Sequence, residues 1–229
     1  MDFQLVFICL CGACLIIPIL GANVWYVVNI FRGRRAHIRL AEAGGYDLLH
    51  DASNDVQKIF GGEINGQPFA FRPAADLSKS YGHNGRSGST VRMLMQIIFP
   101  LNNQKLAGFS MLKNSKVRGV PDTFAEIWST KPSADVLSAD AQQAIYEFAA
   151  TNAHPAGIDG TTFRFKKIVR KLSIFERARW EHSLPADVFP DAVSQMIYDH
   201  PAANIDLSKF NQLLTELAVV AAHLEVKQK

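Results

Sequence analysis

The chain has 229 residues, of which 48% are hydrophobic and 20% charged, a composition typical of a folded protein and not of a disordered one. Its formal net charge of +3 is too small to indicate nucleic-acid binding by itself. All three cysteines, Cys9, Cys11 and Cys14, lie close to the N-terminus. A disulfide-stabilised extracellular domain in the rest of the chain is therefore excluded, and a reducing compartment is permitted.

The apolar run from Leu5 to Val28 contains no charged residue. At about 1.5 Å per residue, a helix of this length reaches across the roughly 30 Å hydrocarbon core of a bilayer. We therefore expect residues 1–31 to form a transmembrane anchor. A cleaved signal peptide would require basic residues before the run, and a lipoprotein signal would require a branched residue where Cys11 stands, so both alternatives are disfavoured.

A cluster of arginines follows this run: Arg32, Arg34, Arg35 and Arg39. Because Lys and Arg collect on cytoplasmic flanks, we expect the N-terminus outside and the C-terminal domain on the cytoplasmic side of the inner (plasma) membrane. The arginines either set this topology alone or also bind anionic lipid headgroups. Residues 32–49 are predicted to be a basic juxtamembrane helix that ends at Gly44-Gly45.

Residues 50–229 are predicted to form a single α+β domain that begins with a β-rich section. Asn65-Gly66, a strong signal for a two-residue hairpin, separates the expected strands 58–64 and 67–72. A polar loop is expected over 81–89, followed by a strand over 90–99 that Pro100 ends. Further strands are expected over 106–112 and 123–128, and together they predict an antiparallel sheet with short connections.

Two helices have clear start signals. Ser138 is a suitable N-cap for a helix to about Ala150, and Asp206 is a suitable N-cap for the last helix. The last helix carries an apolar stripe at helical spacing, which predicts packing on a sheet: Leu207, Phe210, Leu213, Leu214, Leu217, Ala221 and Leu224. Between the two helices, Asp159-Gly160 suggests a second hairpin over 157–168. The stretch 185–200 has no clear pattern, and a short helix after Pro190 is compatible with it.

No motif for catalysis, metal binding or cofactor binding stands out. The glycine-rich stretch 85–90 lacks the lysine and the following helix of a phosphate-binding loop. The seven histidines show no metal-ligand spacing, and no nucleophile elbow is present. Asp187 and Asp191 could serve acid–base chemistry, but their flanking prolines favour a solvated loop. We assign no catalytic residue, no metal ligand and no cofactor.

A basic tract with interleaved aromatic residues is the largest charge bias after the anchor. Its first part consists of Arg164, Lys166, Lys167, Arg170 and Lys171, and it continues to residue 179. Such a tract suits contact with anionic lipid or nucleic acid. Membrane contact is favoured over nucleic acid because the anchor already holds the domain near lipid. The alternative is a basic, solvated outer face whose aromatic residues point inward.

Several segments occur in a recognisable order after the anchor: LAEAGGY, GGEINGQPFAFRP, YGHNGRSGSTVRM, DTFAEIWSTKPSADVLSADAQQAI and GIDGTTFRFK. In this order the chain resembles a family of uncharacterised bacterial single-pass membrane proteins with one cytoplasmic α+β domain. The resemblance implies a bacterial inner-membrane location and supports the expected architecture. It implies no activity and no functional residue.

The expected fold is thus an N-terminal transmembrane helix followed by an antiparallel β-sheet domain packed with two or three helices. The expected function is a membrane-tethered cytoplasmic binding or scaffold module for an unidentified membrane or cytoplasmic protein. One alternative is a membrane-anchored, hydrolase-like enzyme whose site is dispersed along the sequence. The other is contact with anionic lipid or nucleic acid through the basic tract.

Overall fold

The computed structural model describes residues 35–51, 58–81, 87–106, 109–113, 123–131, 133–152, 162–167, 188–200 and 205–225. The expected transmembrane anchor lies outside these ranges. Within them, no helix combines the length and the apolar character that a membrane crossing requires.

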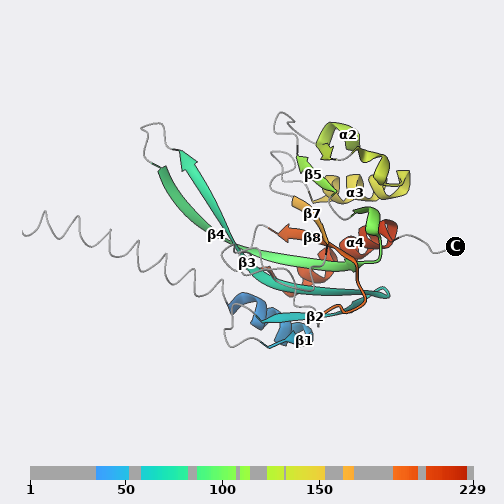
Figure 1. Cartoon of the computed structure of the whole chain (residues 1–229). Helices are drawn as coiled ribbons and strands as arrows, with labels where there is room; N and C mark the ends of the chain where they lie inside the picture. The colour runs from blue at the N-terminus through green and yellow to red at the C-terminus, as the bar shows by residue number, and fades with distance from the viewer. Residues whose placement is uncertain are drawn as a thin grey trace, which may run out of the picture.

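The described residues form an eight-stranded sheet in the order β1-β2-β3-β4-β8-β7-β5-β6, in which neighbouring strands are antiparallel (Figure 1). The strands are β1 Asp47–His50, β2 Ile59–Ile64, β3 Gln67–Tyr81, β4 Ser87–Leu101, β5 Ser110–Lys113, β6 Trp128–Lys131, β7 Thr162–Lys167 and β8 Ser194–His200. Residues 35–44 are helical, and the other helical elements are η2 Gln104–Leu106, α2 Phe124–Ile127, η3 Ala134–Val136, α3 Ala139–Thr151 and α4 Leu207–Leu224. The expected α+β class with an antiparallel sheet is confirmed.

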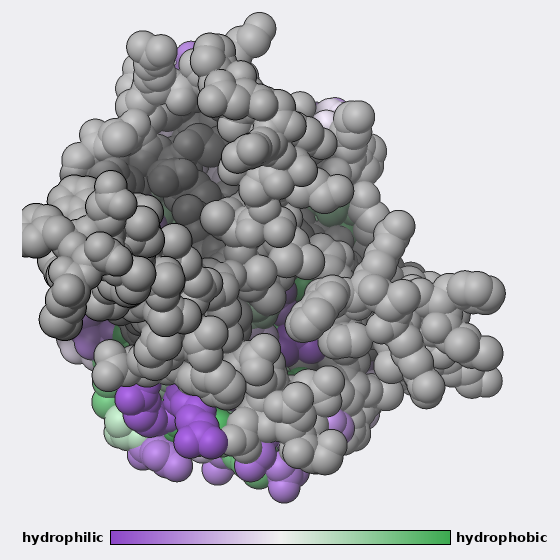
Figure 2. Space-filling model, turned by 90° about the vertical axis from the view of Figure 1, so that its left-hand side faces the viewer, coloured by the Kyte–Doolittle hydropathy of each residue, from purple (hydrophilic) through white to green (hydrophobic). Residues whose placement is uncertain are grey.

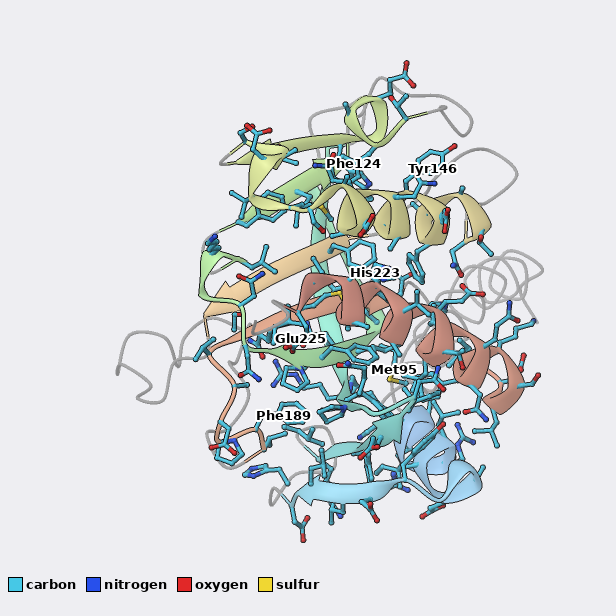
Figure 3. All side chains as sticks on the ribbon, turned by 90° about the vertical axis from the view of Figure 1, so that its right-hand side faces the viewer. Met95, Phe124, Tyr146, Phe189, His223 and Glu225 are labelled. Atoms are coloured by element: carbon cyan, nitrogen blue, oxygen red, sulfur yellow. The ribbon has the colours of Figure 1, made fainter. Side chains whose placement is uncertain are left out.

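The helices α3 and α4 lie side by side over one face of the sheet (Figure 3). Alternate residues of the central strands point to this face, as the period of two in a β-strand requires. The main core between the layers contains Phe69 and Phe71 of β3, Met95 and Phe99 of β4, and Phe210 of α4. The apolar stripe predicted on α4 is confirmed, because the stripe residues between Phe210 and Leu224 are buried in this core.

The opposite face of the sheet carries a second, smaller core. It contains Ile59, Ala70, Ile98 and Ile197 from four strands, together with Val188 from the segment before β8. Ala70 lies between Phe69 and Phe71 in β3, so consecutive residues of one strand contribute to opposite faces. The central strands are therefore apolar on both sides.

Both predicted N-caps are confirmed. The Ser138 hydroxyl accepts a hydrogen bond from the amide of Ala141 at 3.1 Å, and the Asp206 carboxylate accepts one from the amide of Lys209 at 2.9 Å. Each bond satisfies one of the backbone N–H groups that the first turn of a helix leaves unpaired.

The predicted hairpin at Asn65-Gly66 is also confirmed, because both residues have a positive φ, 52° and 75°. Its second strand is much longer than expected. β3 continues through Pro73 to Tyr81 and pairs with β4 down to Ser87. The loop expected over 81–89 is therefore wrong for residue 81 and for residues 87–89, and residues 82–86 lie outside the described part.

Pro73 and Pro100 do not end their strands. The pairing of β2 with β3 ends at Phe71, so Pro73 has β4 as its only neighbour among the described strands. Pro100 pairs with Gln195 of β8, while the pairing of β3 with β4 starts only at Ile98. Among the described strands, each proline thus has a paired neighbour on one side only, and such edge positions tolerate a missing N–H group.

Three other expectations need correction. Residues 123–127 are not a strand, because Thr123 and Glu126 form a capping box that starts α2, and the strand β6 begins only at Trp128. The strand expected over 106–112 begins only at Ser110, after the 3-10 turn η2. The stretch 194–200 is the strand β8 and lies between β4 and β7, so a connection of more than 90 residues separates β4 from its neighbour β8. β7 confirms a strand over 162–167, and the Asp159-Gly160 turn lies outside the described residues.

Candidate functional site

One end of the domain brings together segments that are far apart in the sequence. The pairing of β4 with β8 ends at Met95 and His200, and α4 starts beside this point. Ile205 and Leu207, at the start of α4, line a groove together with the helix 35–44. We call this end the proximal end, because it holds the helix that follows the expected membrane anchor. The C-terminus of α4 lies at the opposite end, where the side chain of Asn103 contacts Leu224.

The helix 35–44 has one buried and one exposed face. Arg35 and Arg39, two of the arginines predicted to set topology, are exposed and four residues apart. Figure 2 shows hydrophilic residues gathered at the lower end of this side of the molecule, where Figure 1 places β1 and this helix. The buried face consists of Ala36, His37, Leu40 and Ala41. Arg32 and Arg34 lie outside the described residues.

The buried face makes this helix part of the domain. Leu40 and Ala41 belong to the main core, together with the apolar residues of α4. The ring of His37 packs edge-on against Phe60 of β2, with 5.7 Å between ring centroids. The described part of the predicted juxtamembrane segment is therefore packed against the domain and is not a free linker.

Tyr46 fastens the turn after this helix to α4. Its ring packs edge-on against Phe69, Phe71 and Phe210 with centroid distances of 5.4 to 5.8 Å. Its hydroxyl donates a hydrogen bond to the side-chain oxygen of Asn211. Burial raises the pKa of the Tyr46 phenol above its usual value. One residue thus joins the end of the helix 35–44 to the middle of the core.

Two open grooves flank the start of α4. The first has a volume of about 370 Å³ and a largely apolar lining that includes Ala36, Leu40 and Leu207 together with Arg39. The second has a volume of about 430 Å³ and is more polar, with Asn152, His200, Lys209 and Gln212 in its lining. Both are open to solvent, whereas small-molecule sites usually enclose most of the ligand. The geometry does not specify a ligand for either groove.

Asp206 lies between the two grooves, and its carboxylate is already engaged. It accepts the capping hydrogen bond and also pairs with Nζ of Lys209 at 3.4 Å. The hydrogen bond from the Lys209 amide holds the pKa of Asp206 below its ordinary value of 3.8. The arrangement stabilises the start of the helix and does not resemble an acid–base site.

The opposite face of the sheet carries a row of polar side chains that the sequence did not reveal. Nε of Arg72 donates to Oε1 of Gln96 at 2.9 Å, and Nε2 of Gln96 donates to Oδ1 of Asp199 at 3.1 Å. The three residues occupy directly opposed positions on β3, β4 and β8. Gln96 and Asp199 are buried, with 5% and 8% of their surface exposed. This row links three neighbouring strands by connecting a guanidinium to a carboxylate through an amide.

The predicted basic tract falls only partly within the described residues. Arg164, Lys166 and Lys167 lie on β7, opposite Ile197, Gln195 and Ser194 of β8. Arg170 and Lys171 lie outside the described part. Because β4 and β8 separate β7 from β3, the described part of the tract, on β7, lies away from Arg35 and Arg39 of the helix 35–44.

The described ranges contain no group of three or more His, Cys, Asp or Glu side chains arranged to hold a metal ion. No protein-family model matches the chain, and no significant match was found among curated proteins or solved structures. The proximal end is therefore the candidate functional site on its geometry alone.

Proposed function

We propose that the protein is a membrane-tethered module whose cytoplasmic domain acts as a binding or scaffold unit for a membrane or cytoplasmic protein. One observation carries this proposal: Leu40 and Ala41, in the helix after the expected anchor, are buried in the main core. Because the domain packs on this helix, only the short segment before Arg35 separates the domain from the expected anchor. A connection this short holds the domain close to the membrane surface, where it can meet a membrane or cytoplasmic partner.

The distance between the expected anchor and the domain is short. Arg35 stands seven positions after Val28, the end of the apolar run. Seven residues span about 10 Å as a helix and at most about 25 Å when fully extended. The exposed Arg35 and Arg39 would accordingly lie near the headgroups on the cytoplasmic side, where Lys and Arg are favoured.

Topology and tethering can be tested on the full-length chain. We expect the chain to resist alkaline extraction from membranes, and C-terminal reporter fusions to be active only as cytoplasmic reporters. A matched variant with Ile16→Arg and Ile17→Arg places two charges in the middle of the apolar run and should release the chain. Extraction of the unmodified chain, or activity of an exported reporter, would contradict the proposal.

The binding role needs a separate test. Crosslinking in native membranes, followed by purification of the full chain, should recover a partner protein reproducibly. The matched control is the chain with Ala41→Glu, which should lose the partner because the domain no longer packs on its own membrane-proximal helix. If the unmodified chain is tethered but yields no partner above this control, the scaffold role is wrong.

A further inference from the structure

The pair β3 and β4 extends beyond the rest of the sheet as a two-stranded ribbon (Figure 1). The pairing of β2 ends at Phe71, and the pairing of β8 ends at Met95. The ribbon thus consists of Ala74–Tyr81 and Ser87–Leu94, and no other described strand pairs with these residues. A two-stranded hairpin alone is only marginally stable in water, so a second surface that covers the ribbon would stabilise it.

The register divides the residue types of the ribbon between its two faces. Cross-strand pairs Ala75–Met93 and Leu77–Val91 occupy one set of alternate positions. The pairs Asp76–Arg92 and Ser78–Thr90 occupy the other set. Because alternate positions of a strand share a face, one face of the ribbon has apolar residue types and the other has polar ones. Nearer the tip, the apolar set continues with Lys79 and Tyr81, types that favour the level of lipid headgroups.

The ribbon leaves the sheet at the proximal end. Met95 and His200 mark the point where the ribbon separates from the sheet, and His200 lines the second groove beside the start of α4. From Ala74 to Tyr81 the ribbon measures about 23 Å, at about 3.3 Å per residue. This length is comparable to the largest distance of about 25 Å that residues 28–35 can span. A ribbon directed toward the anchored side would therefore reach the bilayer surface.

We propose that this ribbon rests on the bilayer that holds the anchor, with the face of residues 75, 77, 91 and 93 on the lipid. The inference rests on the proposed tether. Lys79 shares the set of alternate positions with residues 75 and 77, whereas Asp76 is paired with Arg92 on the other face, so the charge on the lipid-facing set is positive and suits an anionic lipid surface. Contact at a second point would fix the orientation of the domain as well as its distance from the membrane.

The test uses the full-length chain with Cys9, Cys11 and Cys14 replaced by alanine and one new cysteine for a fluorescent label. The labelled chains are Leu77→Cys, Ser78→Cys on the other face, and Val219→Cys on α4, where 48% of the native side chain is exposed. Each is reconstituted into vesicles of phosphatidylcholine with or without phosphatidylglycerol, and the acyl chains carry a quencher. We expect loss of fluorescence at position 77 only, and a greater loss with the anionic lipid.

Two substitutions sharpen the test. Val91→Asp, directly opposite residue 77, should abolish the quenching, whereas Thr90→Asp on the other face should leave it unchanged. An unquenched label at position 77 in a chain that resists alkaline extraction overturns the ribbon proposal and leaves the tether intact. If the labelled chains show energy transfer between copies in place of quenching, the apolar face of the ribbon binds a second copy of the chain. That result also overturns the ribbon proposal. A chain that alkaline extraction releases refutes the tether, and the ribbon proposal with it.

Discussion

The side-chain amide of Asn103 donates a hydrogen bond to the backbone carbonyl of Leu224 at 2.9 Å. Its side-chain oxygen accepts a second bond from the amide of Lys105 at 3.1 Å. One buried residue after β4 therefore satisfies a carbonyl that the end of α4 leaves unpaired and also orders the turn that follows the strand. Glu225 lies at the same end of α4 (Figure 3) and accepts a bond from the backbone amide of Asn102 at 3.4 Å.

Asn103→Ala should lower the free energy of unfolding by about 1–3 kcal/mol, because it leaves a buried carbonyl without its donor. The matched control is Asn102→Ala, since Asn102 is exposed and its bond to Glu225 uses only the backbone. The control should change the free energy of unfolding by less than about 0.5 kcal/mol. Urea denaturation of both variants measures the difference, and equal losses would show that the bond to Leu224 does not stabilise α4.

Gln96→Glu tests the polar row on the opposite face of the sheet. The new carboxylate can still accept from Arg72, but at neutral pH it faces Asp199 in place of an amide donor. We expect a loss of about 1–3 kcal/mol at pH 7. Because repulsion raises the pKa of this carboxylate pair in the folded state, the loss should disappear as the pH falls and a proton is bound.

Gln143→Glu is the matched control for this change. Gln143 is exposed on α3 and bonds to Glu147 at 2.8 Å, so the substitution also places two carboxylates together, but in water. This control should lower the free energy of unfolding by only about 0.2–0.5 kcal/mol. If both variants lose the same stability, burial of the row contributes nothing to the register of the sheet.

Ala41→Glu tests whether the helix 35–44 is part of the folded domain. Ala41 is 1% exposed, so a carboxylate at this position must enter the main core or displace the helix. We expect a loss of at least about 2 kcal/mol, measured by chemical denaturation of the full chain. Ala43→Glu, on the exposed side of the same helix, should change stability by less than about 0.5 kcal/mol. Equal stability of the two variants would mean that the helix is only loosely attached.

Local signals in the sequence were sufficient to predict two helices and one hairpin. Ser138 and Asp206 each have a side chain that can cap a helix, and each is followed by apolar residues at helical spacing. Asn65-Gly66 predicts its turn because both positions accept positive φ. The same kind of signal, the capping box of Thr123 and Glu126, would have predicted α2 if it had been preferred to the apolar pattern.

The rest of the fold could not be predicted, because it depends on contacts between residues that are distant in the sequence. Whether a proline ends a strand depends on whether a neighbouring strand needs its N–H group, and the neighbours of Pro73 and Pro100 are not local information. Gln96 and Asp199 meet across 103 positions of the sequence, and only the register of β4 with β8 makes them adjacent. Part of the ribbon was predicted, because the strand expected over 90–99 includes Thr90 to Met93, but the glycines at positions 82, 85 and 88 favoured a loop over 81–89.

The pH dependence of stability tests whether the ionised Asp206 stabilises the start of α4 at the proximal end. Its folded-state pKa is lowered below 3.8, chiefly by the hydrogen bond from the Lys209 amide. A lowered pKa means that the ionised group stabilises the fold above pH 3.8, and that this contribution is lost as the pH falls through the lower folded value.

Asp206→Asn retains a capping oxygen but cannot ionise, so the difference in melting temperature between the native chain and this variant should shrink below pH 4. Asp206→Ala, which removes the cap, should melt at a lower temperature than Asp206→Asn throughout this range. A difference between the native chain and Asp206→Asn that stays constant from pH 7 to pH 3 would show that the charge of Asp206 does not stabilise α4.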